Sequence, residues 1–519
     1  MGSIRLANTG GKGMQAAKKG AFNVIYGLLG QIITICLGIV IPRLVLVSYG
    51  SEVNGLLNSV NQIFVYFSLF EAGVGVASLQ ALYAPVAQED RGRINGIIAA
   101  THRFYCKAGV LYALAVTALA FVYPFVVKTE ISYWVIVGVI LFGGLGNCLN
   151  FLYQGKYKIL MQAEGYTYIS TNITTIINVL INVAKTAVLL MGYNVLVVQM
   201  VYFAINICQM LIYYAYVRKH YQWIDLKAEP DNRAIEQKGA TLIHQIAGMI
   251  FSNTDVLLLT LITQNLKIVS IYTMYNTIVT MVTTMIQQVS AGFDFRLGQI
   301  YNTDRKQYYV LHHVFEIIYM LLVFSAMTVV YLFILPFMRL YTAGIQDINY
   351  ISKWYPICFV MVPMLTYGRT AASNVINYAG HFRKTQWRAV AESVINIVVS
   401  VFGIYKWGIY GALLGTIIAS LYRTNDMIFY VYKHLIPGNP LTTYKRWISC
   451  FGVFALVVAW INPDNPAFSS YPKILFFGCI YGVVFAAIYT LVQMILNPGE
   501  TKVAGAIIRD CVNKWKGRN

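Results

Sequence analysis

Ionisable side chains inside long apolar stretches are the residues of this sequence that could do chemistry. A charge in the lipid phase is costly unless it faces protein or water, so such residues mark substrate or ion paths. Four cations are candidates for contacts with a substrate in a cavity: Arg369, Arg423, Lys185 and Arg43. Four acids are candidates for gating or ion coupling: Glu71, Asp255, Glu316 and Asp426.

Arg369 is the strongest candidate for substrate binding. With a rise of about 1.5 Å per residue it lies about 13 Å from the inner end of its span, too deep to reach the interface easily. No acid stands three or four residues away on the same helix. A guanidinium group suits a pyrophosphate because its planar fork donates two parallel hydrogen bonds. We therefore expect Arg369 to face a hydrated cavity and to contact a pyrophosphate.

The other charged candidates leave alternatives open. Arg423 and Asp426 lie three residues apart on one helix face, so they could pair with each other or contact the substrate. Lys185 lies near the outer end of its span, where its side chain could extend to the interface. Glu392 lies close to the inner end of its span, and we expect its carboxylate to reach the interface.

A polar cluster around Asp255 is the candidate site for a coupling cation. Asp255 directly follows Ser252, Asn253 and Thr254, and such a cluster could cap a break in the helix or bind a cation. Asn253 and Asn396 are the expected partners of Asp255, with Na⁺ or H⁺ as the coupling ion. We expect no other cofactor and no metal centre.

Signatures of catalysis are absent from the sequence. There is no GxxxxGK[ST] phosphate-binding loop, no HExxH and no CxxC. The eight cysteines are scattered and have the pattern of small buried hydrophobic residues. The loops between the apolar stretches are too short for a soluble catalytic domain, which needs at least about 50 residues. We therefore expect no enzymatic activity.

These residues belong to a chain with the composition of a polytopic membrane protein. Of its 519 residues, 58% are hydrophobic and 11% are charged, whereas soluble globular proteins have about 25% charged residues. Fourteen stretches are long and apolar enough to span a membrane. They cover residues 21–47, 56–83, 104–127, 133–152, 169–191, 195–217, 240–262, 269–292, 309–335, 354–378, 389–405, 408–432, 447–461 and 474–495.

The basic residues predict how these spans are oriented. The net charge is +19, and 29 of the 39 Lys and Arg residues fall in the segments on one side of the membrane. Because cytoplasmic loops carry the excess of Lys and Arg, both termini are expected in the cytoplasm. The basicity is therefore mainly an orientation signal, and we expect no nucleic-acid partner. No cleavable signal peptide is visible, so the first span is retained.

The sequence also contains an internal repeat. Glu71-Ala72-Gly73 is echoed by Ser290-Ala291-Gly292, and further pairs follow in the same order at offsets of 214 to 219 residues. The repeat predicts an all-α fold of fourteen transmembrane helices, with two parallel six-helix lobes, two C-terminal helices and a site at the lobe interface. The expected divisions are an N-lobe at 1–217, a cytoplasmic inter-lobe loop at 218–239, a C-lobe at 240–432, and a cytoplasmic loop, two helices and a basic cytoplasmic tail at 433–519.

Several short segments have sequence patterns similar to those of one transporter family. They are Ile41-Pro42-Arg43-Leu44, Glu71-Ala72-Gly73-Val74-Gly75, Gln162-Ala163-Glu164-Gly165, Asn253-Thr254-Asp255 and Gly292-Phe293-Asp294. Over about residues 18–435 the chain resembles the multidrug/oligosaccharidyl-lipid/polysaccharide (MOP) exporter superfamily, and specifically its polysaccharide-transporter branch, the Wzx-type flippases.

The resemblance implies a V-shaped transporter of the bacterial plasma membrane that works by alternating access. Its implied cargo is an undecaprenyl-pyrophosphate-linked oligosaccharide, moved from the inner to the outer leaflet for cell-surface polysaccharide biosynthesis. The expected partners are this cargo, membrane lipids, and glycan polymerase and assembly proteins, and we expect the protein to act as a monomer.

Two features leave alternatives to this function open. Fourteen spans are more typical of lipid II and teichoic-acid flippases than of many Wzx-type members. The first span lacks both the acid of proton-coupled drug exporters and the cationic cluster of lipid II flippases. The alternatives are a MATE-like cation-coupled drug or metabolite antiporter, and a lipid II or teichoic-acid precursor flippase. A membrane-embedded glycan polymerase or ligase is disfavoured because a large outer loop is missing.

Overall fold

The protein is all-helical throughout the residues that its computed structural model describes, which are 12–71, 73–235, 239–464, 468, 470–502 and 505. The chain divides into two compact units, Met1–Leu242 (unit 1) and Ile243–Asn519 (unit 2). The described helices make up fourteen long segments, and eight of them are apolar enough to cross a membrane by length and composition alone. The predicted all-α membrane fold is confirmed. Residues 1–11, Ala72 and most of the predicted basic tail, 506–519, lie outside the described residues.

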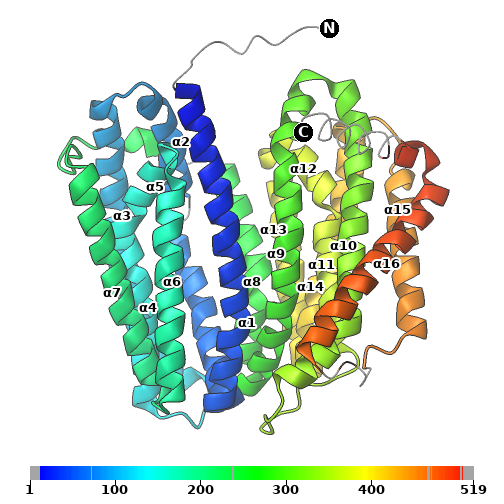
Figure 1. The fold of residues 1–519 in the computed structure, drawn as a ribbon, viewed down its shortest axis with the longest axis horizontal. Coiled ribbons are helices and arrows are strands. Elements are labelled where there is room, and N and C mark those ends of the chain that lie inside the picture. The colour runs from blue at the N-terminus through cyan, green and yellow to red at the C-terminus, as the bar shows by residue number, and fades with distance from the viewer. Residues whose placement is uncertain are drawn as a thin grey trace. The chain divides into compact units, whose positions relative to one another are not determined.

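Unit 1 contains the first six predicted spans (Figure 1). Its α-helices are α1 (Lys12–Phe67), α2 (Val74–Ala87), α3 (Arg91–Val126), α4 (Tyr133–Leu149), α5 (Gly155–Ala163), α6 (Thr167–Leu190) and α7 (Val195–His220). The first two spans meet at Gly50, whose φ of 82° lies in the left-handed region that glycine tolerates best. In this unit α4 packs along α7, α1 along α6, and α3 along α4.

Two irregular backbone segments interrupt the helices of unit 1. The second span breaks between the 3-10 turn Ser68–Phe70 and α2, where Gly73 has a φ of 82°. The π-helix Asn150–Gln154 joins α4 to α5, and the Lys156 Nζ donates to the carbonyls of residues 152 and 153 at 3.3 and 3.2 Å. Non-helical backbone at membrane depth is tolerated where it is buried in protein or lines a hydrated cavity.

Unit 2 contains the remaining eight predicted spans. Its α-helices are α8 (Gly239–Thr263), α9 (Leu266–Thr303), α10 (Arg305–Tyr341), α11 (Tyr355–Gly368), α12 (Thr370–Tyr378), α13 (Phe382–Trp407), α14 (Ile409–His434), α15 (Leu441–Trp460) and α16 (Tyr471–Leu496). Together α11 and α12 form the tenth span, which is broken at Arg369. The two helices outside the repeat, α15 and α16, pack against α10.

The hairpin of α13 and α14 is packed through glycines. A Cβ atom on Gly411 would lie 1.9 Å from the carbonyl carbon of Gly403, so the two backbones are in direct contact. The chain turns between the helices at Gly408, which has a φ of 54°. Small residues let membrane helices approach closely. This approach brings the polar side chains of the two helices within reach of each other.

Candidate functional site

Three arginines and two acids form a connected ionic network in unit 2. The Arg369 Nη2 lies 2.6 Å from Glu392 Oε1, and Glu392 Oε2 lies 3.5 Å from the Nε of Arg423. The Arg423 Nη1 lies 2.8 Å from Asp426 Oδ2, and Arg388 also pairs with Asp426. These five residues, here called the arginine–acid network, carry three positive and two negative charges, which leaves an excess of one positive charge.

The centre of the arginine–acid network is buried. The exposed fractions of Arg423, Glu392 and Arg369 are 3%, 6% and 9%. Of the two alternatives for Arg423, the structure contains its pair with Asp426. The expectation that Glu392 reaches the interface is wrong, because two arginines hold its carboxylate inside the unit. Its partner Arg369 is on another helix, so spacing along one helix could not reveal the pair.

Arg369 also lines a polar cavity of about 490 Å³ formed by α9, α10, α11, α12 and α14. It stands at the break between α11 and α12. A Cβ atom on the preceding Gly368 would lie 2.6 Å from the ring of Trp447, so α15 packs directly against this break. In the same lining, Asn374 Nδ2 donates to Asp294 Oδ1 at 2.5 Å. Contact between Arg369 and a pyrophosphate remains a prediction.

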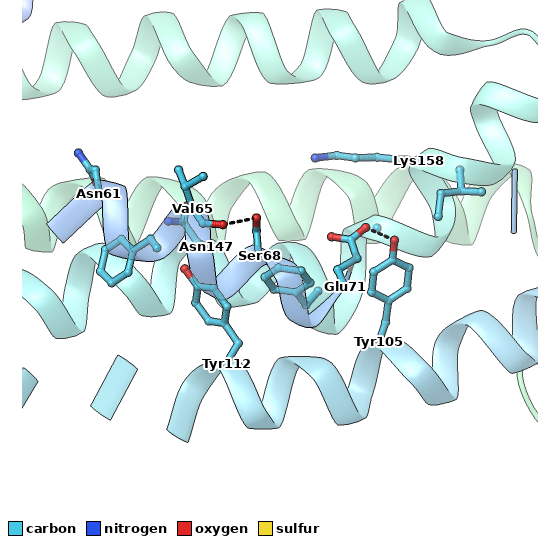
Figure 2. A pocket seen from close by; sticks show the side chains of 12 residues that line it. Asn61, Val65, Ser68, Glu71, Tyr105, Tyr112, Asn147 and Lys158 are labelled. Carbon is cyan, nitrogen blue, oxygen red and sulfur yellow. Dashed lines mark hydrogen bonds between the residues drawn. The ribbon is translucent and has the colours of Figure 1, made fainter. Parts of the chain in front are cut away.

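A second polar cavity, of about 560 Å³, lies in unit 1 and is lined by residues of α1, α3, α4 and α5 (Figure 2). In its lining, the Tyr105 hydroxyl donates a hydrogen bond to Glu71 Oε1. A Cβ atom on Gly75 would lie 3.0 Å from that hydroxyl and 3.1 Å from Glu71 Oε1. The acid-plus-glycine segment noted in the sequence therefore places a carboxylate at a helix break and leaves room for its hydrogen bond. Lys158 of α5 lies beyond the predicted span at 133–152, and it also lines this cavity.

The two cavities occupy matching places in the internal repeat. The first is lined from spans 2, 3 and 4, and the second mainly from spans 8, 9 and 10. Glu71 and Ser290, which the repeat aligns, each line their own cavity. The fourth and tenth spans are both irregular beside the cavity that they line, through the π-helix Asn150–Gln154 and the break at Arg369.

Asp255 lies at the centre of another buried cluster in unit 2. Its Oδ2 accepts hydrogen bonds from the hydroxyls of Tyr272 and Thr416, each at 2.8 Å. The Asn396 Nδ2 donates to the same Thr416 hydroxyl at 2.9 Å. Within the described residues, Asp255 Oδ1 and Asn396 Oδ1 are buried without a hydrogen-bond partner. The structure thus brings together two of the three predicted cation-site residues and adds Tyr272 and Thr416.

Three predicted residues remain to be placed: Asn253, Lys185 and Arg43. Asn253 donates to the Met249 carbonyl of its own helix at 2.8 Å. The Lys185 Nζ lies 4.6 Å from the ring centroid of Tyr202, a cation–π contact between α6 and α7. Arg43 is half-buried on α1 and is not among the residues that line the two polar cavities.

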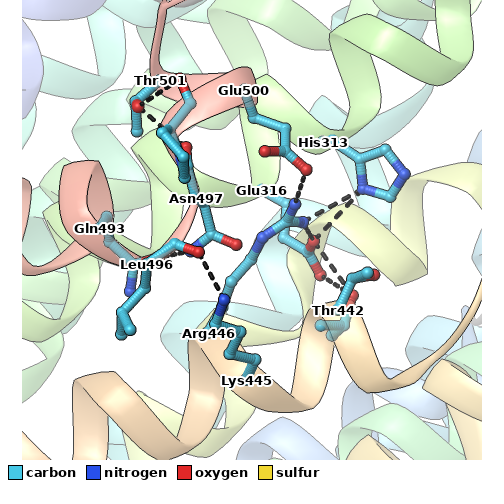
Figure 3. A network of polar contacts seen from close by, with 12 residues as sticks. His313, Glu316, Thr442, Lys445, Arg446, Gln493, Leu496, Asn497, Glu500 and Thr501 are labelled. Atoms are coloured by element: carbon cyan, nitrogen blue, oxygen red, sulfur yellow. Dashed lines mark hydrogen bonds and ion pairs between the residues drawn. The ribbon is translucent and has the colours of Figure 1, made fainter.

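Glu316 lies in a network that fastens the C-terminal helices to α10 (Figure 3). The buried guanidinium of Arg446 pairs with Glu316, and its Nη2 reaches Glu500 Oε1, just after α16, at 3.2 Å. Thr443 also donates to Glu316, at 2.8 Å. Glu316 therefore holds α15 in place and lines neither polar cavity. Arg446 directly precedes the predicted span 447–461, and nothing in the sequence marks it as the partner of Glu316.

Comparison with known proteins relates the fold to transporters. No protein-family model matches the sequence, and no curated protein matches it. Among solved structures, the lipid II flippase MurJ in an inward closed conformation matches with 13% identity and a TM-score of 0.64, covering 91% of this chain and 98% of that chain.

Multidrug transporters match as well. An inward-facing MATE family transporter of the MOP superfamily matches with 12% identity and a TM-score of 0.60, over 78% of this chain and 95% of that chain. The MATE multidrug transporter DinF-BH matches with 13% identity and a TM-score of 0.57, over 79% of this chain and 94% of that chain. At these identities the likeness is one of fold. The chain is a multi-pass membrane protein with the fold that MurJ and the MATE transporters of the MOP superfamily share.

Proposed function

We propose that this protein is a flippase that moves an undecaprenyl-pyrophosphate-linked oligosaccharide from the inner to the outer leaflet of a bacterial plasma membrane. The observation that carries this proposal is Arg369, which lines a polar cavity while belonging to a buried network with an excess positive charge. A pyrophosphate entering the cavity would compete with Glu392 for the Arg369 guanidinium, because both anions accept hydrogen bonds from this group. Exchange of Glu392 for the pyrophosphate as the partner of Arg369 would couple cargo binding to rearrangement of the helices. In this proposal both termini of the chain lie in the cytoplasm.

A lipid-linked cargo is favoured over a drug by the extent of the structural likeness. The match to MurJ covers 91% of this chain, whereas the two MATE matches cover 78% and 79%. MurJ is described as a lipid II flippase, so lipid II is the second candidate cargo for this protein. The oligosaccharide remains our first proposal because the sequence segments resemble the polysaccharide-transporter branch.

Reconstitution tests the proposed cargo directly. We expect the full-length protein in liposomes to expose fluorescently labelled undecaprenyl-pyrophosphate-linked oligosaccharide of the inner leaflet to a glycan-cleaving enzyme added outside. Protein-free liposomes are the control for leakage and spontaneous flipping. Exposure of lipid II but not of the oligosaccharide would support the second candidate. Exposure of neither lipid would contradict a flippase function.

We further propose that Asp255, Asn396 and Thr416 hold the coupling Na⁺ or H⁺. An unpartnered buried polar atom costs about 1–3 kcal/mol, and this cluster contains two, Asp255 Oδ1 and Asn396 Oδ1. Both atoms are oxygens, which are the ligands that hard cations such as Na⁺ prefer. A proton on the Asp255 carboxylate would likewise remove the cost of leaving Oδ1 without a partner. The cation would bind inside unit 2, separately from the cavity that Arg369 lines.

Asp255→Asn should remove the dependence of flipping on an ion gradient. We expect the wild-type initial rate in liposomes to rise several-fold when a Na⁺ or pH gradient is imposed, and the variant to flip at one rate under both conditions. The reason is that the amide removes the negative charge that would balance the ion. Asp347→Asn, in an exposed outer segment, is the matched control. A wild-type rate that is unchanged when both gradients are collapsed would refute the coupling site.

A further inference from the structure

The unit 1 cavity combines a wall of aromatic rings with a small set of polar groups. The ring centroid of Tyr112 lies 6.5 Å from that of Phe64 and 5.0 Å from that of Phe151. Tyr105 extends this wall, with its ring centroid 6.4 Å from that of Phe151. All four rings line the cavity. Such a surface suits a ligand with a flat apolar face.

The polar groups of this cavity have no net charge. Figure 2 shows Lys158 on one side of the cavity, Tyr105 and Tyr112 on the other, and Glu71 between them. One carboxylate and one ammonium group cancel. The lining of the unit 2 cavity also holds one acid, Asp294, and one cation, Arg369, but Arg369 is linked there to the arginine–acid network, which has an excess positive charge. A diphosphate would meet the Glu71 carboxylate here, but a neutral ligand with many hydroxyl groups would find both a strong acceptor and a strong donor.

The backbone around this cavity is irregular on two sides. The break after Ser68–Phe70 places Glu71 at the cavity, and the π-helix Asn150–Gln154 places Phe151 there. π-Helical turns within α-helices are frequent at functional sites. They disturb the regular hydrogen bonding of the helix, so they persist where they position a side chain that is needed. Gly75 keeps open the space that the Glu71–Tyr105 hydrogen bond occupies. The two irregular segments therefore position the acid and part of the aromatic wall.

We propose that this cavity is the saccharide-binding subsite of the transporter and takes a sugar ring of the lipid-linked oligosaccharide. This inference rests on the proposed function and names the part of the cargo that unit 1 recognises. A sugar ring has an apolar C–H face for the wall of Tyr112 and Phe151, and a rim of hydroxyl groups for Glu71, Lys158 and Asn147. The volume of about 560 Å³ lies within the range of about 300–1,000 Å³ typical of small-molecule sites.

Binding of four lipids to the full-length protein in nanodiscs tests this subsite. The probes are undecaprenyl pyrophosphate alone and the same lipid carrying one glucose, galactose or N-acetylglucosamine. We expect at least one sugar-carrying lipid to bind the wild-type protein about tenfold more tightly than the bare lipid, since a few charge-assisted hydrogen bonds give a difference of this size.

Variants of the cavity should lose this sugar advantage and nothing else. Lys158→Met and Glu71→Gln should each bring the best sugar-carrying lipid close to the affinity of the bare lipid, while the bare-lipid affinity stays at the wild-type value. Unchanged bare-lipid affinity also shows that the variant is folded. Lys107→Met, exposed on α3, is the matched control and should keep the full advantage. Arg369→Ala should weaken all four lipids by the same factor.

The outcomes separate this inference from the proposed function. Wild-type protein that binds the bare lipid but gains nothing from any of the three sugars overturns the subsite and leaves the flippase proposal standing. A sugar advantage that survives in both cavity variants overturns it too, and so does an equal loss for bare and sugar-carrying lipids. Wild-type protein that binds none of the four lipids refutes the proposed function itself, and the subsite with it.

Discussion

Arg369→Ala should slow flipping of the undecaprenyl-pyrophosphate-linked oligosaccharide by about 10- to 100-fold. A hydrogen bond to a charged group contributes about 1.5–3 kcal/mol, and each factor of ten in rate corresponds to about 1.4 kcal/mol. The measurement is the initial rate at which the labelled lipid becomes accessible in liposomes, normalised to the amount of reconstituted protein. Arg369→Lys should retain part of the rate, because it keeps the charge but loses the planar fork.

The matched control for Arg369→Ala is Arg339→Ala. Arg339 also pairs with an acid, since its Nη2 lies 2.5 Å from Asp464 Oδ2, but half of its side chain is exposed. Exposed pairs contribute little to stability, so this variant should flip at the wild-type rate. A wild-type rate in folded Arg369→Ala protein would remove Arg369 from the binding site and with it the observation that carries the proposed function.

Depth in a span identified Arg369 from the sequence, but it could not identify the partner. Lipid excludes unpaired charge, so a cation about 13 Å into a span has to face protein or water. Whether this cation faces protein or water depends on the packing of another helix, here α13, which carries Glu392. Glu392 was misplaced for this reason, because its own depth allowed an escape to the interface while the packing of α13 against α14 turned it inward.

Helix periodicity also could not locate the residues of the unit 1 cavity. Lys158 follows the apolar part of the fourth span, so a count of hydrophobic residues leaves it outside the predicted span at 133–152. The helix continues through a π-helical segment into α5, and this continuation carries Lys158 to the cavity. Glu71 was found because an acid stands in an apolar stretch, whereas Tyr105 was one of 39 tyrosines with nothing in its spacing to distinguish it.

Part of the Asp255 cluster could be predicted from the sequence. Asp255 and Asn396 are polar residues in apolar spans and were selected for that reason, and the structure connects them through Thr416. Threonine is common in membrane helices, where its hydroxyl bonds the preceding turn, so sequence alone gives it no special role. Asn253 was selected by its closeness in sequence to Asp255, but its side chain bonds a carbonyl of its own helix.

Glu392→Gln should lower the free energy of unfolding by about 3–5 kcal/mol. The change removes the carboxylate that Arg369 and Arg423 share, so the buried Arg369 would lose its acid partner and the buried Arg423 would keep only Asp426. The measurement is thermal or denaturant unfolding of the purified protein, with Asp347→Asn as the control at an exposed acid. The same unfolding midpoint in both variants would show that the Glu392 carboxylate is dispensable to the network.

A double variant and a ligand separate the charge effect from a packing effect. Arg369→Ala added to Glu392→Gln should recover part of the lost stability, because it removes the cation that Glu392→Gln leaves without its acid partner. If the two substitutions damaged the fold independently, their losses of stability would add instead. Undecaprenyl pyrophosphate should raise the midpoint of Glu392→Gln more than that of the wild-type protein. In the variant Arg369 lacks its carboxylate partner, so the lipid's diphosphate no longer competes with Glu392 for that guanidinium, and its tighter binding to the folded state becomes added stability.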